Sequence, residues 1–356
     1  MPESSSRSEY RQEAPGQLRG DGEVLPGGGM AREVVAIADD QVSEHHQLHR
    51  LDPDQVPDGA YRKKLGWQFW TPLAWLLLVL VLAILANWLE TKGIIRSPEK
   101  LGKPVNGQQP KNLSPFSRFG GEFYPLGTDK LGRDMLARII YGARVSLEVG
   151  FGSIFLGLAI GAPIGIVAGY FKNQYRGIVD VSLMFVMYVL LAFPPLLLAL
   201  LLINFTEARL GGRQTYVIVF AIGIIAIPPI ALLVRAATLS FTQREFVLAA
   251  RTIGASHLRV IVKEVFPNVI LPIVSFAIIG VAIAITAEGA LAFLGLSVQP
   301  PTPTWGGMIN EGRGAFDNGE FWPALTPCIV MFITILCLNL TGDRVREYFD
   351  VKEGAL

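Results

Sequence analysis

The stretch REFVLAARTIGASHLRVIVKEVFPN, residues 244–268, lies between two long apolar segments. Its apolar side chains recur at helical spacing on both sides of Gly254, which predicts a helix, a glycine break and a second helix. Glycine can adopt the left-handed conformation that ends a helix, and Ala249 and Ala250 allow a neighbouring backbone to approach closely. The pattern indicates either a docking element for a protein partner or an amphipathic segment lying on the lipid surface.

The segments around this stretch are apolar enough to cross a membrane. Of the 356 residues, 51% are hydrophobic and only 17% are charged, and the mean hydropathy is +0.41. A membrane-spanning helix needs about 20 apolar residues. Six runs reach or approach this length: 71–89, 145–171, 178–204, 215–237, 268–295 and 324–341. We therefore predict an all-α membrane protein with six transmembrane helices, two of which are interrupted at Pro194-Pro195 and Pro228-Pro229.

Residues 1–60 have a different composition from the rest of the chain. They are rich in Ser, Gly, Pro and charge and lack apolar periodicity, which predicts a disordered tail. We expect no secretory signal peptide, because no short apolar core with a cleavage site precedes Tyr61. The histidines of this tail, His45, His46 and His49, are either solvated or form a weak metal site. The predicted membrane domain is 61–356, with 240–267 as its polar loop.

The distribution of cations predicts which way the chain crosses the membrane. Six spans place both termini on the same side. Arg62, Lys63 and Lys64 precede the first span, and the short loops on the side of the termini carry more cations than those opposite, so we expect both termini in the cytoplasm. The stretch 244–268 is then cytoplasmic as well. A net charge of +1 argues against nucleic acid as a partner.

The sequence contains no familiar catalytic motif. It has no G-x-x-x-x-G-K-[ST] phosphate loop, since Gly102-Lys103 is followed by Pro104 where a Ser or Thr would bind Mg²⁺. Neither H-E-x-x-H nor G-x-S-x-G occurs. We therefore expect no catalytic residue, no metal site and no cofactor in this chain.

Three segments together carry a resemblance to a known family. The opening stretch matches E-x-V-x-A-A-x-x-x-G-A-S-x-x-R…P-N through Glu245, Val247, Ala249, Ala250, Gly254, Ala255, Ser256, Arg259, Pro267 and Asn268. This resembles the EAA loop of ABC importer permeases, in the form of the dipeptide and oligopeptide branch. PLGTDKLGRDMLARIIYGARVSL (125–147) and EGALAFLGLSVQPPTPTWGGMI (288–309) resemble further segments of that branch. Two departures from the general motif are Leu248, where it has an acid, and Phe266, where it has Leu.

The resemblance implies a non-catalytic permease subunit with a type I fold. Residues 240–267 would form the coupling loop, seated in a groove of a separate ATPase chain that binds ATP and Mg²⁺. The contact residues implied are Glu245, Ala249, Ala250, Gly254, Ala255, Ser256 and Arg259. Further implied partners are a second, homologous permease, a second ATPase domain and an extracytoplasmic peptide-binding protein, in the plasma membrane of a bacterium or archaeon.

The resemblance leaves the substrate open. Dipeptides and oligopeptides are the first expectation, and nickel chelates or glutathione are alternatives within the same branch. A secondary carrier would instead show inverted repeats and paired broken helices; the two proline pairs faintly suggest this, but the polar loop would then have no purpose. A membrane enzyme would need a cluster of catalytic residues.

Glu288 is an acid well inside the fifth predicted span, so we expect it to face the interior of the bundle or a cavity. It would either line or gate the translocation path, together with the helix interruptions at Pro194 and Pro228, or form a structural hydrogen bond between helices. Glu148 and Asp180 lie nearer the ends of their spans, which favours a structural role.

The segment GTDKLGRD, residues 127–134, precedes the second predicted span. Thr128 and Asp129 are good helix-capping residues, and Asp134 with Arg138 forms a possible i,i+4 pair, which together predict a short outer helix. The family resemblance implies that this helix and the loop 297–323 form an outer gate and a seat for the binding protein. The residues proposed for that role are Asp129, Arg133, Asp134 and Trp305. Trp305 and Trp322 also suit interfacial anchoring.

Overall fold

The computed structural model describes residues 66–172, 177–210 and 215–353. Its helices are α2 (Trp67–Thr91), α3 (Met135–Phe171), α4 (Ile178–Ala192), α5 (Pro195–Leu210), α6 (Thr215–Thr242), α7 (Glu245–Thr252), α8 (His257–Val260), α9 (Phe266–Phe293), α10 (Trp305–Gly312) and α11 (Trp322–Glu353). A π-helical turn, η3 (Ile261–Val265), precedes α9, and a 3-10 helix, η4 (Arg313–Asn318), follows α10. Two strands, β1 (Ser117–Phe119) and β2 (Glu122–Tyr124), pair antiparallel. The tail predicted at 1–60 lies outside the described residues.

Five helices of the described chain are each long and apolar enough to cross a membrane. A bent pair of shorter helices would bring the number of spans to six if the pair counts as one span. The pair is α4 and α5, which meet at an angle of 93°. The interruption predicted at Pro194-Pro195 within 178–204 is therefore confirmed. Phe193 is extended, with ψ at 133°, because a residue before a proline avoids the helical region, and Pro194 and Pro195 both lack the N–H that would continue the helix.

The second proline pair behaves differently. Pro228 and Pro229 lie inside α6, which continues from Thr215 to Thr242 without a break. The predicted interruption at this pair was therefore wrong. Pro228 is buried, and α6 makes its most extensive contact with α3, so packing holds this helix together across the missing backbone hydrogen bonds.

Glycines on α3 bring its backbone against that of α6. A Cβ atom on Gly161 would lie 2.8 Å from the carbonyl oxygen of Ile227, and one on Gly165 would lie 2.5 Å from that of Ala231. Both distances are too short for a side chain. Small residues spaced four apart therefore let the two helices pack in direct backbone contact, as is common between membrane helices.

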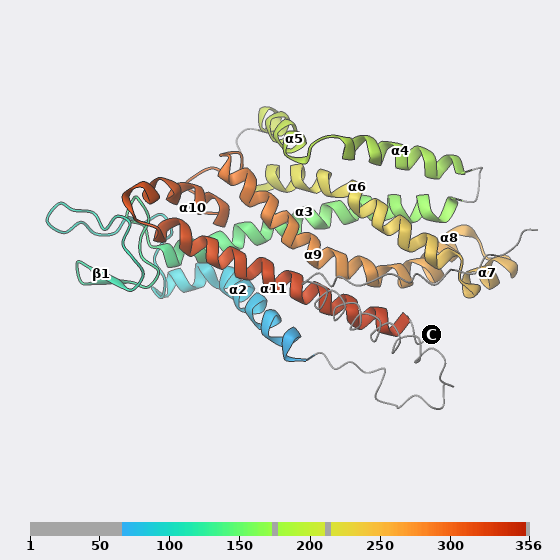
Figure 1. Ribbon diagram of the computed structural model, residues 1–356, viewed down its shortest axis with the longest axis horizontal. Coiled ribbons are helices and arrows are strands. Elements are labelled where there is room, and N and C mark those ends of the chain that lie inside the picture. The colour runs from blue at the N-terminus through green and yellow to red at the C-terminus, as the bar shows by residue number, and fades with distance from the viewer. Residues whose placement is uncertain (1–65, 173–176, 211–214, 354–356) are drawn as a thin grey trace, which may run out of the picture. The chain divides into compact units, whose positions relative to one another are not determined.

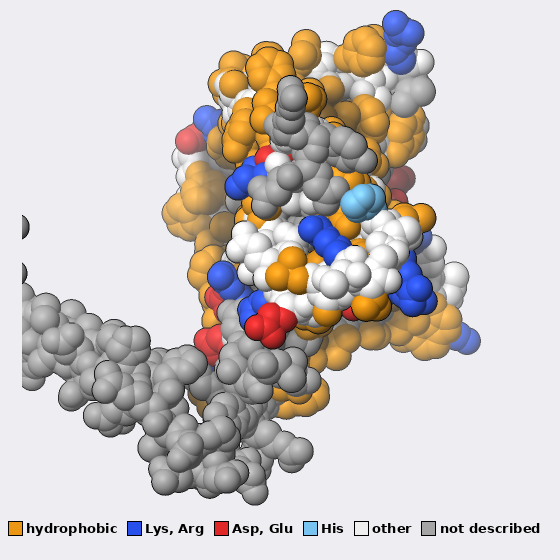
Figure 2. Space-filling view, turned by 90° about the vertical axis from the view of Figure 1, so that its right-hand side faces the viewer, with side chains coloured by type: hydrophobic (Ala, Val, Ile, Leu, Met, Phe, Trp, Pro, Cys, Tyr) orange, Lys and Arg blue, Asp and Glu red, His pale blue; other side chains and the backbone are white. Residues whose placement is uncertain are grey.

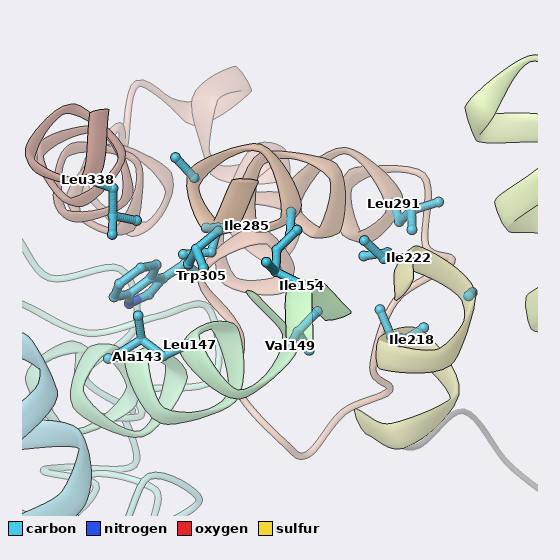
Figure 3. Packing of buried hydrophobic residues seen from close by; sticks show 14 of the residues in the cluster. Ala143, Leu147, Val149, Ile154, Ile218, Ile222, Ile285, Leu291, Trp305 and Leu338 are labelled. Atoms are coloured by element: carbon cyan, nitrogen blue, oxygen red, sulfur yellow. The ribbon is translucent and has the colours of Figure 1, made fainter. Parts of the chain in front are cut away.

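The largest buried cluster joins α2, α3, α5, α6, α9, α10 and α11. Figure 3 shows Trp305 beside Ala143 and Leu147, with Leu338 and Ile285 nearby, while Ile218 and Ile222 of α6 lie at the other side of the group. Trp305, Ile218 and Ile285 are completely buried. This core lies towards the end of the bundle where α3 begins.

The described bundle carries a different kind of segment at each end. The short helices α7 and α8 lie at one end, and the strands β1 and β2 lie at the other, close to α10 (Figure 1). We call residues 244–265 the helical hairpin and residues 92–134 the distal lobe. The α3 helix runs from the distal lobe to the end that carries the helical hairpin (Figure 1).

Candidate functional site

The helical hairpin has the backbone that its sequence predicts. Arg244 is extended and starts α7, and Gly254 takes φ of +83° just after α7 ends. The Gly254 N–H donates to the Arg251 carbonyl at 3.0 Å and the Ala255 N–H to the Ala250 carbonyl at 3.1 Å. No atom lies within 4 Å of a Cβ built on Gly254, so the position requires glycine for its left-handed conformation and not for lack of space.

The inner side of the helical hairpin is anchored in the bundle. Val247, Val260 and Val265 are completely buried in a cluster with side chains of α3, α6 and α9. Ala250 and Ala255 are half-buried against the same cluster. These contacts fix the hairpin to the end of the helices that flank it.

The outer side of the helical hairpin presents the remaining residues of the motif. Glu245, Ala249, Gly254, Ser256 and Arg259 are all exposed. They are accompanied by large apolar side chains: Ile253 is 84% exposed and Leu258 is 72% exposed. Figure 2 looks onto this end of the bundle and shows hydrophobic side chains and cations among polar surface. Apolar side chains at an exposed tip, with small residues beside them, favour contact with another macromolecule or a membrane surface.

The Pro-Asn pair that closes the motif shapes the start of α9. The Phe266 N–H donates to the Ile261 carbonyl, which is the wider spacing of a π turn. Pro267 cannot donate a backbone hydrogen bond. The side-chain amide of Asn268 donates to the Glu264 carbonyl at 2.6 Å. Asn268 thus satisfies a carbonyl group at the irregular junction between the hairpin and α9.

Glu288 faces the interior, as the sequence predicts. Its side chain is completely buried near the end of α9. The Ser297 hydroxyl donates to Oε1 at 2.7 Å, and the Ser146 hydroxyl of α3 donates to Oε2 at 3.5 Å. Ser146 Oγ in turn accepts the Trp305 N–H at 3.2 Å. Both carboxylate oxygens are bound by the chain's own hydroxyls, so this geometry favours the structural interpretation of Glu288.

The three residues predicted for a translocation path occupy separate places. Glu288 lies in the buried core at the end of α9, Pro194 is exposed at the break between α4 and α5, and Pro228 is buried within α6.

Asp180 forms a structural ion pair: Arg235 Nε and Nη2 donate to its two oxygens, each at 2.6 Å. This agrees with the structural role expected for Asp180. Glu148 instead lies exposed on the surface of α3.

A network of buried charges joins the distal lobe to α3 and α10. Arg133 Nε lies 2.6 Å from Asp129 Oδ2, and Arg133 Nη2 lies 2.6 Å from Glu311 Oε2. Arg138, which is 1% exposed, contacts the same two acids at 3.3 and 3.0 Å. Two cations and two acids thus compensate one another. Sequence inspection missed Glu311, which sits on α10, 173 residues from Arg138.

Two predictions about the start of α3 were wrong. Asp134 does not pair with Arg138; it caps α3 by accepting the Leu136 N–H at 2.9 Å and lies 3.5 Å from Arg96. Burial raises the pKa of Asp134, and the Leu136 N–H and Arg96 oppose this shift. The predicted short outer helix is also absent from the described chain, because Asp129 accepts the Leu131 and Arg133 N–H groups in a turn. The helix begins only at Met135.

Trp305 was wrongly predicted to be an interfacial anchor. It is completely buried, and its indole Nε1–H donates to the Ile139 carbonyl of α3 at 3.1 Å. Gly142 lies close to the ring. By contrast, Trp322 is 42% exposed, which suits the role expected for it.

The residues predicted for binding-protein docking therefore lie beneath the surface. Asp129, Arg133, Asp134 and Trp305 are each at most 6% exposed. They cannot form the contact face directly in this conformation, but they hold the segments that do reach the surface. A cavity of about 210 Å³ lies beside this network, lined by Arg138, Glu311 and the loop from Gly295 to Thr304.

Comparison with known proteins places the chain in a family. Residues 161–353 match the family described as binding-protein-dependent transport system inner membrane component. The chain is 35% identical over 233 residues to the dipeptide transport system permease protein of Haemophilus influenzae, covering 65% of this chain and 76% of that protein. It is 34% identical over 313 residues to a glutathione transport system permease protein of Escherichia coli, covering 85% of this chain and 93% of that protein.

A third relative is the di/tripeptide transport system permease protein of Pseudomonas aeruginosa. It is 37% identical over 227 residues, which cover 64% of this chain and 72% of that protein. The family match spans the helical hairpin and four of the predicted spans, and the similarity to the Escherichia coli protein covers most of the chain. The chain therefore belongs to the binding-protein-dependent transport system inner membrane components, the membrane-spanning permease subunits of ABC importers.

Proposed function

We propose that this permease imports short peptides, with the helical hairpin as the element through which an ATPase drives it. The relatives are permeases for dipeptides, di- and tripeptides, and glutathione. All three names describe molecules of two or three residues. This shared chemistry supports a short peptide as the substrate, and it does not favour a nickel chelate.

The exposed face of the helical hairpin is the observation that carries the coupling role. Ile253 and Leu258 are strongly exposed, while Val247 and Val260 anchor the same element in the bundle. A surface that docks a partner and transmits its motion needs both properties. We propose that Glu245, Ala249, Gly254, Ser256 and Arg259 contact the ATPase directly, and that Ala250 and Ala255 set how closely it approaches.

The proposed complex contains a second, homologous permease, two ATPase domains and an extracytoplasmic binding protein, all within or beside the membrane lipid. ATP and Mg²⁺ would bind to the ATPase chains, and this chain would perform no catalysis. The exposed position of Glu148 supports the presence of a second permease. Glu148 lies exposed on α3 inside a candidate span, where a carboxylate facing lipid is unfavourable, so a protein neighbour or water is expected there.

We propose that the helical hairpin and both termini lie in the cytoplasm. The hairpin carries Arg251, Arg259 and Lys263, in agreement with the positive-inside rule. The distal lobe then faces the outside, where a binding protein would dock. Pro194 and Pro228 remain predictions for the translocation path, and Glu288 would take part in a gate only if its bonds to Ser146 and Ser297 open during transport.

The test is purification of this chain from its native membrane in mild detergent, followed by an ATPase assay of the purified material. Dialanine, trialanine and glutathione would each be added with the binding protein. We expect a second permease and ATPase chains to copurify, and hydrolysis to rise with at least one of the three peptides. Stimulation by none of them, in a complex that hydrolyses ATP, would contradict the peptide assignment.

A further inference from the structure

The helical hairpin is joined by the chain itself to only two helices. Gln243 connects it to α6, and its last segment, η3, runs directly into α9. The α3 helix has no such covalent continuity, although it is the helix that packs most extensively on α6 and also packs on α9. Besides the indirect route through α6 and α9, a direct link between the hairpin and α3 must therefore come from contacts between their side chains.

Tyr170 provides this link at the last turn of α3. Its side chain is 2% exposed, and its hydroxyl lies 3.0 Å from Nδ1 of His257, a hydrogen-bonding distance. The two rings also meet edge to face, with centroids 5.8 Å apart. The neighbouring Phe171 ring lies 5.0 Å from Tyr170 and 5.8 Å from His257. Aromatic pairs at such distances attract in a defined geometry.

The second contact comes from the other helix of the hairpin. The guanidinium carbon of Arg251, on α7, lies 4.7 Å from the centroid of the Tyr170 ring, within the range of a cation–π interaction. Arg251 precedes the Gly254 turn and His257 follows it. Tyr170 is therefore held from both sides of the turn, and it contacts α7 and α8 at once.

The far end of α3 reaches the distal lobe. With 37 residues and a rise of about 1.5 Å per residue, the helix is about 55 Å long. Near its beginning, Arg138 enters the ion network with Glu311, and Ser146 bonds to the Trp305 N–H. One helix thus connects the helical hairpin to the segments that surround α10.

We propose that Tyr170, His257 and Arg251 form a clamp that makes the helical hairpin and α3 move together, so that displacement of the hairpin reaches the distal lobe through α3. All three are positioning residues: they act on transport by fixing one element to another. This proposal rests on the coupling role proposed above, and it adds a direct contact between the hairpin and α3 to the indirect route through α6 and α9.

The first test measures the distance between the two clamped elements. Spin labels would be attached at Lys172→Cys and Thr252→Cys in a chain with Cys328→Ala and Cys337→Ala, within the complete complex in lipid nanodiscs. Distances would be recorded without nucleotide and after trapping with ATP and vanadate. We expect the same narrow distribution in both states, and a broader one in both states when Tyr170→Phe or His257→Ala is added.

Either of two results would overturn the clamp. The first is a distance distribution that shifts on trapping although Tyr170 and His257 are both present. The second is a distribution in the Tyr170→Phe or His257→Ala chain that is as narrow as in the chain with both residues, in both states. The comparison without nucleotide needs no ATPase activity. A complex that fails to hydrolyse ATP would therefore count against the proposed function, while the clamp would still be decided by the breadth of the distribution.

The second test measures coupling itself. Uptake of dialanine and glutathione would be measured per ATP hydrolysed in proteoliposomes. We expect Tyr170→Phe to reduce this ratio about fivefold or more while hydrolysis continues. Tyr141→Phe is the matched control, because Tyr141 lies on the same helix and its hydroxyl donates to Glu90. We expect its ratio to equal that of the unaltered complex. An unchanged ratio in Tyr170→Phe, or an equal loss in both variants, would exclude the clamp.

Discussion

The two ends of the bundle place polar and apolar residues in opposite ways. At the helical hairpin, Ile253 and Leu258 are exposed, as are five residues of the motif: Glu245, Ala249, Gly254, Ser256 and Arg259. At the distal lobe, Asp129 and Arg133 are buried and bound to each other, and Asp129 also binds the buried Arg138 of α3. The exposed face of the hairpin favours contact with another molecule, for which we propose the ATPase, whereas the polar residues of the lobe bind within their own chain. Two segments that look equally suited to docking in the sequence have different physical roles.

The largest effect is expected from breaking the hairpin turn. Gly254→Pro cannot adopt the φ of +83° found there, because proline is fixed near −65°. We expect ATP-driven uptake to be abolished while the complex remains in the membrane. Ala250→Arg should act similarly, since it places a long cation where a half-buried methyl group now packs. Uptake and membrane content would be measured together.

Gly254→Ala is a milder change at the same position. An L-residue in the left-handed region costs about 1–2 kcal/mol, and no atom stands in the way of the added methyl group. We expect partial uptake. Normal uptake in both Gly254→Pro and Ala250→Arg would show that the hairpin has no part in coupling. The proposed difference in role between the helical hairpin and the distal lobe would then be wrong.

A smaller effect, on stability instead of coupling, is expected at the distal lobe. Arg138→Met removes a buried cation and leaves Asp129 and Glu311 with Arg133 alone. Breaking a buried ion pair by removing one partner costs about 3–5 kcal/mol. We expect a lower midpoint of thermal unfolding, with ATP hydrolysis retained at temperatures below it.

Lys130→Met is the matched control for Arg138→Met. Lys130 lies in the same region but is exposed, so its loss should leave the midpoint nearly unchanged. If both variants unfold at the same temperature as the unaltered protein, the buried network does not stabilise the lobe.

The smallest effect is expected from Trp305→Phe. This change keeps an aromatic ring in the core but removes the hydrogen bond from Nε1 to the Ile139 carbonyl. The Ile139 carbonyl lies inside α3 and keeps its helical partner, so the loss is that of one hydrogen bond, about 0.5–1.5 kcal/mol. Trp322→Phe, at an exposed position, should cost little. Unfolding midpoints of the two variants would be compared, and a larger loss in Trp322→Phe would reverse the assignment of the two tryptophans.

The contrast also explains what could be predicted from sequence. The helical hairpin follows from local signals, since apolar spacing and Gly254 act within a few residues of one another. The inward orientation of Glu288 follows from the cost of an exposed acid in a membrane. The partner of Arg138 does not follow from either rule, because Glu311 lies on a distant segment that only the tertiary fold brings near.

The two proline pairs show a related limit. Both have the same local chemistry, yet the chain bends by 93° between α4 and α5 and continues without a break through Pro228 and Pro229. Packing against α3 decides the second case. Proline identity therefore predicts where a helix can bend, and neighbouring helices decide whether it does.

The π turn η3 fixes the angular phase between the helical hairpin and α9. A π turn holds one residue more than an α turn, and one residue corresponds to about 100° of rotation around a helix axis. If all five residues of Ile261–Val265 were kept but ran as a regular α-helix, each would turn the chain further than it does in the wider π turn. The hairpin would then swing by about a quarter of a circle relative to Glu288, and its apolar tip would point to a different side of the bundle. The length of this turn thus sets the direction in which the permease presents Ile253 and Leu258.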